Sequence, residues 1–206
     1  MAKILVACEE SQTVTKEFRK LGHEAYSCDI LPTSGENPEW HYQQDVRELL
    51  KKDWDMIIAF PPCTYLTNAS AVRMYPKKGI IDNARLEKAI EAKNFFMLFY
   101  NANCEKIAIE NPVPLKIVGL PERTQIIQPY QFGHAYSKKT CLWLKNLPPL
   151  MPTKIIADYQ PFINGGGNRL EKSNYKNKKF ASGSVARSKT FSGIAEAMAK
   201  QWGNLF

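Results

Sequence analysis

The sequence lacks any apolar run near the length that a membrane span needs. Roughly 20 consecutive apolar residues are required to cross a bilayer, and none of the 206 residues belongs to such a run. The first ten residues also lack the cationic start, the longer apolar stretch and the small-residue cleavage site of a secretory signal. We therefore expect a cytoplasmic protein without membrane contact.

Cysteine and histidine are scarce and scattered. The five cysteines are odd in number and form no Cys-x-x-Cys pair, and the three histidines do not cluster. This excludes a disulfide framework and argues against a metal site, since metal ligands must converge. Each cysteine is therefore interpreted separately. The cysteines are Cys8, Cys28, Cys63, Cys104 and Cys141.

Negative charge is in short supply, with 20 acidic against 28 basic side chains and a net charge of +8. Much of the excess lies between residues 169 and 189, where Glu171 is the one acid. The basic residues there are Arg169, Lys172, Lys176, Lys178, Lys179, Arg187 and Lys189. Three glycines, at 165–167, precede them. The segment is typical of a basic loop that contacts the phosphates of a polyanion, and the alternative is a merely solvated loop.

The length and the 44% hydrophobic content fit one domain, residues 1–206. Strand-like and helical patterns alternate along the chain, which predicts a doubly wound, mostly parallel α/β sheet with helices on both faces. Segments 125–128 and 140–144 are two further strands, which we interpret as an antiparallel pair at one edge. The earlier strands are predicted at 3–8, 23–29, 54–60 and 106–109, and helices after 12, over 82–101 and over 192–202.

Polar side chains follow four of these strands, where α/β folds bind ligands. Cys63 comes after two prolines that fix the backbone, which favours a rigidly aimed thiolate nucleophile over an inert buried thiol. Glu110 ends a later strand and is placed to protonate or hydrogen-bond a ring nitrogen, with a helix cap or surface acid as the alternative. Asp29 stands where such folds keep an acid for ribose hydroxyls. Ser11 or Thr13 is expected to cap the first helix.

Two of these segments resemble the motifs of a known family. Residues 58–63, Ile-Ala-Phe-Pro-Pro-Cys, with Thr67 and Ser70 downstream, and residues 108–112, Ala-Ile-Glu-Asn-Pro, resemble the Pro-Cys and Glu-Asn-Val motifs of the C5-cytosine DNA methyltransferases in their compact phage or prophage form. The resemblance covers most of residues 3–150. It implies a Rossmann-like methyltransferase sheet, S-adenosyl-L-methionine as cofactor and DNA as partner.

The resemblance also implies a mechanism. The thiolate of Cys63 would add to C6 of a cytosine turned out of its stack, while Glu110 holds or protonates N3. C5 then becomes nucleophilic and takes the methyl group, after which the C5 proton and the thiolate leave. The family's Gln-x-Arg-x-Arg motif is missing, and Arg123, Lys138 or Lys139 is expected to replace its arginine.

The resemblance implies a cofactor site in which Asp29 binds the ribose and Asp45 the adenine amino group. The family's glycine-rich turn is missing, because residues 8–12 contain no glycine. We expect backbone amides and the Ser11 hydroxyl to serve instead. Trp40 either stacks on adenine or packs in the fold. The complete set of expected cofactor residues is Cys8, Glu9, Ser11, Gln12, Asp29, Ile30, Asp45, Val46, Phe60 and Pro62.

Residues 151–190, a basic loop rich in Gly and Lys, stand where the family has a separate target-recognition domain, so phosphate contacts are expected to dominate. Asn111 and Tyr65 are expected to contact the nucleic acid, together with Arg169, Lys172, Lys176, Lys178, Lys179 and Arg187. Alternative substrates are a cytidine nucleotide, a single strand or RNA. The other alternative is a catalytically silent nucleic-acid-binding relative.

Overall fold

The computed structural model describes residues 1–162 and 189–206. Its centre is a seven-stranded sheet with the order β3-β2-β1-β4-β5-β8-β6. Five strands are parallel, and β8 runs antiparallel between β5 and β6. The strands are β1 (Lys3–Ala7), β2 (Glu24–Asp29), β3 (His41–Gln43), β4 (Met56–Ala59), β5 (Lys106–Pro112), β6 (Gln125–Ile127) and β8 (Thr140–Lys145).

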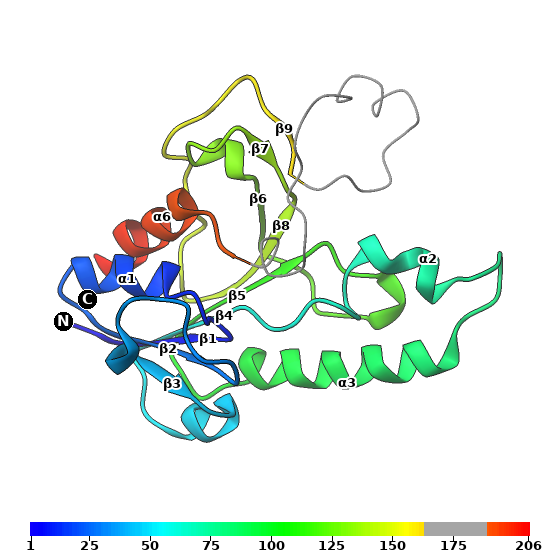
Figure 1. The fold of residues 1–206 in the computed structure, drawn as a ribbon, viewed down its shortest axis with the longest axis horizontal. Helices are drawn as coiled ribbons and strands as arrows, with labels where there is room; N and C mark the ends of the chain where they lie inside the picture. Colours follow the sequence, from blue (N-terminus) through cyan, green and yellow to red (C-terminus); the bar gives the residue numbers. More distant parts are fainter. Residues whose placement is uncertain (163–188) are drawn as a thin grey trace.

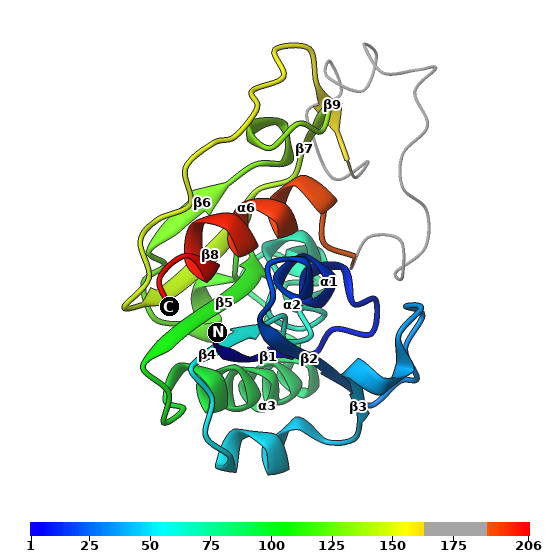
Figure 2. The same ribbon diagram turned by 90° about the vertical axis from the view of Figure 1, so that its left-hand side faces the viewer.

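Helices cover both faces of this sheet, as Figures 1 and 2 show. Helices α1 (Thr13–Lys20) and α6 (Ser192–Gly203) pack together on one face, and α3 (Asn83–Tyr100) crosses the other. The predicted fold class is therefore confirmed: a doubly wound, mostly parallel Rossmann-like sheet with an antiparallel pair at one edge. Strand β3 follows the predicted loop and was missed, because three residues are too few to show a periodic pattern.

Alternate residues of the strands point to opposite faces and so build two separate cores. Leu5 and Ile57 belong to the core beneath α3 with Phe96 and Phe99, whereas residues of the other parity pack beneath α1 and α6. The latter core includes Ile4, Val6, Phe18, Met56, Ile58, Ala108, Met198 and Trp202. Because both faces are covered, the central strands are apolar throughout, and β4 is buried at every position.

Short helical turns connect these elements and position the loops at the carboxyl edge. They are η1 (Pro38–Trp40), η2 (Val46–Lys51), η3 (Asn68–Ser70), α2 (Ala71–Met74), η4 (Lys116–Val118) and η5 (Pro129–Gln131). Within the part of the chain that the structure describes, no helix is long and apolar enough to cross a membrane.

A small lobe stands beyond the antiparallel edge of the sheet (Figure 1). Its strands β7 (Tyr136–Ser137) and β9 (Gln160–Pro161) pair in parallel. The rings of Tyr130 and Tyr159 stack with their centroids 4.1 Å apart. Residues 151–162, predicted as the first part of the basic loop, thus contribute to this lobe. The predicted phosphate contacts of Arg169, Lys172, Lys176, Lys178, Lys179 and Arg187 lie outside the described residues.

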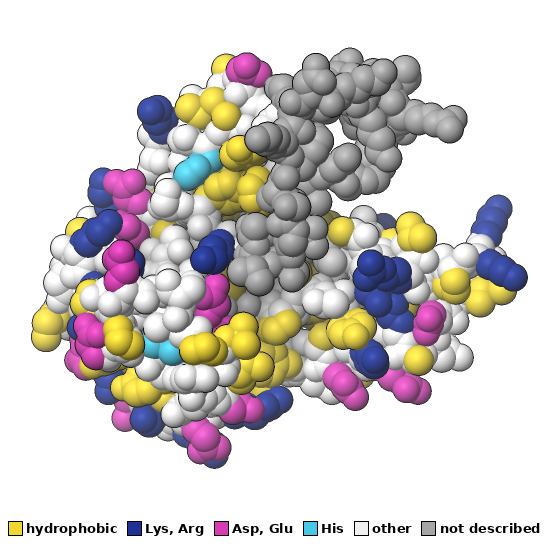
Figure 3. Space-filling view, in the orientation of Figure 1, with side chains coloured by type: hydrophobic (Ala, Val, Ile, Leu, Met, Phe, Trp, Pro, Cys, Tyr) yellow, Lys and Arg dark blue, Asp and Glu magenta, His cyan; other side chains and the backbone are white. Residues whose placement is uncertain are grey.

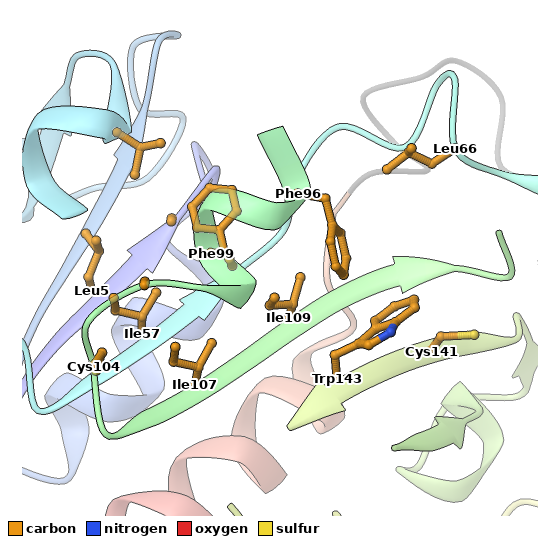
Figure 4. Packing of buried hydrophobic residues seen from close by; sticks show 14 of the residues in the cluster. Leu5, Ile57, Leu66, Phe96, Phe99, Cys104, Ile107, Ile109, Cys141 and Trp143 are labelled. Atoms are coloured by element: carbon orange, nitrogen blue, oxygen red, sulfur yellow. The ribbon is translucent and has the colours of Figure 1, made fainter. Parts of the chain in front are cut away.

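The contact between α3 and β8 gives a first test of the fold. Figure 4 shows the Phe96 ring directed at Trp143, and the two centroids are 5.0 Å apart with the planes at 76°. Phe96 is fully buried. We expect Phe96→Ala to lower the free energy of unfolding by about 3–5 kcal/mol, because truncating a buried ring leaves a cavity. Urea unfolding measures this difference.

The matched control is Ile90→Ala on the same helix, where the side chain is 48% exposed. It should change the free energy of unfolding by less than about 1 kcal/mol. Equal losses for the two variants would contradict the packing described for α3.

Candidate active site

Four strand ends lie at one level of the sheet. The register places Cys28, Ala7, Ala59 and Ile109 opposite one another across β2, β1, β4 and β5. The next residue of each strand is one of the predicted site residues, in the order Asp29, Cys8, Phe60 and Glu110. These four residues therefore follow one another along the carboxyl edge, where the sequence predicted a common site.

Negative charge surrounds the Cys8 thiol at this edge. Burial raises the pKa of Cys8, and the negative charges of Asp29 and Asp45 raise it further. Asp29 Oδ1 accepts a hydrogen bond from the Leu31 N–H at 2.9 Å. Beside it the Ile30 side chain is 73% exposed. The edge thus presents carboxylate and apolar surface together.

Asp45 itself begins the turn η2. Its carboxylate accepts from the Arg47 N–H at 2.9 Å and forms an ion pair with the Arg47 guanidinium. These bonds to Arg47 lower the pKa of Asp45, which keeps the carboxylate ionised. The following residue, Val46, is 5% exposed and packs in the core.

The turn of residues 8–12, which contains no glycine, combines a strained backbone with two buried side chains, Glu9 and Gln12. Cys8 and Gln12 both adopt left-handed backbone angles, with φ of 58° and 57°, a region that glycine enters at no cost. The Glu9 carboxylate caps helix α1. It accepts from the Val14 N–H at 2.6 Å, from the Thr15 N–H at 3.2 Å and from the Thr15 hydroxyl at 2.7 Å.

Ser11 provides part of the predicted cap, since its hydroxyl accepts from the Thr13 N–H at 3.4 Å and lies 2.9 Å from the Thr13 hydroxyl. Glu9, which was not predicted as a cap, supplies the bonds to the next two N–H groups. Sequence reasoning favours short polar side chains at a helix start, and a buried glutamate that reaches forward across the turn does not fit that pattern.

Gln12 is buried as well, and its amide holds the loop of residues 33–37. Its Nε2 donates to the Asn37 carbonyl at 2.6 Å, and its Oε1 accepts from the Asn37 N–H at 3.3 Å. A side chain at Gly35 would meet Gln12 Oε1 at 2.2 Å, so this close approach requires glycine. The side chains of Glu9 and Gln12, both expected at a cofactor, are thus engaged inside the fold.

The Pro-Pro-Cys loop is joined to the end of β5. The Asn111 amide donates from Nδ2 to the Pro61 carbonyl at 2.9 Å, and both residues are buried. Farther along, Thr67 and Pro114 form an isolated antiparallel bridge. Asn111 is 0% exposed, so its side chain positions the Cys63 loop and is not at a surface that nucleic acid could reach.

Cys63 is half-buried at the start of a tight turn. Its carbonyl accepts from the Leu66 and Thr67 N–H groups, each at 3.0 Å. Arg85, which the sequence did not single out, donates to the Thr64 carbonyl at 3.1 Å from helix α3. The loop is therefore fastened on both sides of the thiol.

A pocket opens on the α6 side of the sheet, beside Glu110. Its space is continuous with open solvent. The residues that line it are Phe60, Glu110, Lys138, Thr140, Lys189, Thr190, Phe191, Ile194 and Met198. Burial raises the pKa of Glu110, and the positive charge of Lys138 opposes that shift. The pocket thus contains a carboxyl group that holds its proton more tightly than a solvated glutamate does.

The structure distinguishes the three candidates for the missing arginine. Lys138 lines the pocket and acts on Glu110. Arg123 and Lys139 are both exposed. Lys138 is also held in place, because its N–H donates to Gln128 Oε1 at 2.8 Å.

Several pocket residues carried no recognisable signal in the sequence. Residues 189–191 and helix α6 reach the pocket from the far end of the chain. Lys189 also bonds towards the glycine-free turn, since its Nζ lies 3.3 Å from Ser34 Oγ and 4.0 Å from the Glu10 carboxylate. It thus connects the turn of residues 8–12 with the Glu110 pocket.

Tyr65 and Trp40 are both half-buried. The Tyr65 ring lies against the α3 core and beneath Arg85, whose guanidinium carbon is 4.9 Å from the ring centroid. The Arg19 guanidinium carbon lies 5.0 Å from the centroid of the Trp40 ring. The contact of Tyr65 with nucleic acid and the stacking of Trp40 on adenine stay predictions.

A projecting arm, residues 71–81, follows the Cys63 loop. It contains no acidic residue, and its cations Arg73, Lys77 and Lys78 are exposed. Val72 and Ile80 are 81% and 52% exposed. Figure 3 shows basic and hydrophobic side chains together on this part of the surface, at the right. Such a mixture is typical of nucleic-acid-binding surfaces, where cations meet phosphates and apolar groups meet bases.

Several solved structures are similar to this chain, and three of them are described here. A protein described as a DNA modification methyltransferase from an Escherichia coli prophage is 14% identical, with a TM-score of 0.44, 76% of this chain covered and 52% of that one. The Entamoeba histolytica methyltransferase EhMeth is 11% identical, with a TM-score of 0.47 and coverages of 76% and 58%. The Schizosaccharomyces pombe Dnmt2 methyltransferase is 15% identical, with a TM-score of 0.39 and coverages of 72% and 50%.

The chain thus spans about half the length of the solved structures that it matches. No family model matches the sequence, and no curated protein matches it. Among residues 1–162 and 189–206, no group of three His, Cys, Asp or Glu side chains could hold a metal ion.

The cap formed by Glu9 predicts an unusual dependence of stability on pH. Burial raises the pKa of Glu9 to about 7 from its ordinary 4.5, although the bonds from Val14 and Thr15 lower it. The folded protein therefore binds this proton more tightly than the unfolded chain does. The stabilisation is complete below the unfolded pKa and is lost as the pH rises to about 7, an effect on the order of 3 kcal/mol.

We expect Glu9→Gln to remove this slope, because the amide fills the same space without titrating. Urea unfolding at intervals from about pH 4.5 to about pH 7.5 measures it. The control is Glu10→Gln, next in the chain. Identical pH profiles for wild type and Glu9→Gln would show that Glu9 is ionised throughout.

Proposed function

We propose that this protein is an S-adenosylmethionine-dependent methyltransferase that methylates C5 of cytosine in DNA. One observation carries the proposal: the hydrogen bond from Asn111 to the Pro61 carbonyl joins the loop of Cys63 to the strand end of Glu110. A thiol and a carboxyl whose pKa is raised by burial are thereby held at the ends of neighbouring strands. A pyrimidine needs both groups to become nucleophilic at C5, one at C6 and the other at N3.

The two groups divide the work. The Cys63 thiolate forms a bond to C6, and the electrons of the C5–C6 double bond move towards the ring nitrogen. Glu110 delivers its proton to N3, and the pKa that burial raises favours the protonated carboxyl as the donor. Lys138, which lines the same pocket, stabilises the carboxylate that remains. After C5 is alkylated, loss of its proton returns the electrons and expels the thiolate.

The carboxyl edge of β1 and β2 fits the cofactor. S-adenosylmethionine, when bound, supplies a methyl group on an electrophilic sulfonium. Asp29 and Asp45 would accept from the hydroxyl and amino groups of its adenosine, and the exposed Ile30 offers an apolar surface to the adenine. Glu9 and Gln12 support this site indirectly, because they hold the turn and the 33–37 loop.

The test is a covalent trap. DNA with 5-fluorocytosine should form a stable adduct with the wild-type protein in the presence of cofactor, because fluorine at C5 cannot leave as a proton. Denaturing electrophoresis and mass spectrometry detect the adduct. Cys63→Ser should abolish it, and Glu110→Gln should slow its formation by about 10²–10⁴-fold.

Thermal unfolding of each variant shows whether a loss of adduct reflects loss of fold. Duplex, single strand, RNA and cytidine nucleotide are tested in parallel, so a different substrate appears as an adduct on another nucleic acid or on the nucleotide. Absence of any adduct, with no calorimetric binding of cofactor, would leave the silent nucleic-acid binder as the function.

The projecting arm predicts how binding depends on salt. Lys77→Gln with Lys78→Gln should weaken duplex binding and make the slope of log K against log salt less negative by about 1.8, since each phosphate contact contributes about 0.9. The control, Lys51→Gln with Lys52→Gln, removes the same charge near η2. Fluorescence anisotropy measures both slopes, and equal changes would place the contact elsewhere.

A further inference from the structure

His134 lies where the small lobe meets the first turn of helix α6. Its Nε2 accepts from the Gly193 N–H at 3.0 Å and lies 3.4 Å from the Ser192 hydroxyl. A side chain at Gly193 would meet the Phe132 carbonyl at 1.9 Å, so the helix can approach this closely only with glycine there. The imidazole therefore supplies a capping acceptor from a distant segment of the chain.

The same ring supports one wall of the Glu110 pocket. Its centroid is 5.0 Å from that of Phe191, which lines the pocket and directly precedes α6. Phe191 is held from the other side by Phe162, with centroids 4.7 Å apart. Ile194 and Met198 line the pocket from α6 itself. Any shift of the helix start would therefore move the pocket wall.

The acceptor role fixes the charge of His134. A ring nitrogen accepts only when it carries no proton, so Nε2 is bare and the ring is neutral. A protonated ring would direct an N–H at the Gly193 N–H and add positive charge to the positive end of the helix dipole. Burial lowers the pKa of His134, which favours the neutral form.

Charged side chains on the neighbouring elements do not alter this conclusion, because burial accounts for the lowered pKa. Glu196, one turn into α6, is exposed and forms an ion pair with Lys200. The titratable groups on the elements around the ring are Tyr130, Tyr136, Lys138, Lys154, Tyr159, Lys189 and Glu196.

We propose that His134 is a positioning residue of the pocket: its neutral ring holds the start of α6 and Phe191 in place, and its protonation releases them. The proposal rests on the proposed function in one respect, the identity of the substrate that the pocket binds. It predicts that the pocket wall loosens in mild acid, over a range set by this one histidine.

Amide hydrogen exchange of Gly193, followed by NMR and divided by the intrinsic rate at each pH, tests the contact directly. In the wild type, protection should fall at least tenfold between about pH 7.5 and about pH 4.5. His134→Gln places an acceptor that does not titrate near Nε2, so protection should persist across that range. His134→Phe keeps the ring contact without the acceptor, so protection should be low throughout.

His41→Gln, on β3, is the matched control and should behave as the wild type. The rate of 5-fluorocytosine adduct formation is then measured over the same range. Its acid decline should be steeper in the wild type than in His134→Gln, a difference that a purely structural role would not produce. Wild-type Gly193 protection that does not change with pH would overturn the inference, whereas pH-dependent protection without any adduct would instead contradict the proposed function.

Discussion

The hydrogen bond between the Asn111 amide and the Pro61 carbonyl is the constraint on which the candidate site depends. Two consecutive prolines end β4 and lack N–H groups, so the loop that carries Cys63 cannot be held by donors of its own at those positions. The Pro61 carbonyl is directed into the fold, where an unpaired acceptor costs about 1–3 kcal/mol. Asn111 satisfies it from the neighbouring strand.

This bond leaves a cost of its own. Asn111 is buried, and its Oδ1 has no hydrogen-bond partner among the described residues. The presence of asparagine here indicates that fixing the Pro61 carbonyl stabilises the protein by more than the unpaired Oδ1 destabilises it. The turn of residues 8–12 follows the same principle, since left-handed Cys8 and Gln12 are retained where glycine would be free of strain. In that turn, the hydrogen bonds of Glu9 to α1 and of Gln12 to the 33–37 loop offset the cost of the strained backbone.

The sheet and its main helices could be predicted because each is long enough to show a hydrophobic period. The strand ends could be predicted as a site because parallel register brings them to one edge. The wall of the pocket beside Glu110 could not be predicted from the sequence. Lys189 and Phe191 meet residues more than fifty positions away, and no local spacing records such contacts. The capping by Glu9 was missed for a related reason, since its side chain bonds groups five and six residues ahead of its own position.

Side-chain parity explains which predicted residues share the pocket and which do not. Ala108 packs on the α6 side and Ile107 and Ile109 on the α3 side, so Glu110 must point to α6 and Asn111 away from it. Because the side chains of Glu110 and Asn111 point to opposite faces of β5, they are not placed to contact one substrate together. The alternation does not decide between Lys138 and Lys139. Leu142 faces α6 and Cys141 faces α3, which assigns Thr140 to the α6 side of β8. Both lysines precede this strand, so only the tertiary structure could show that Lys138 lines the pocket.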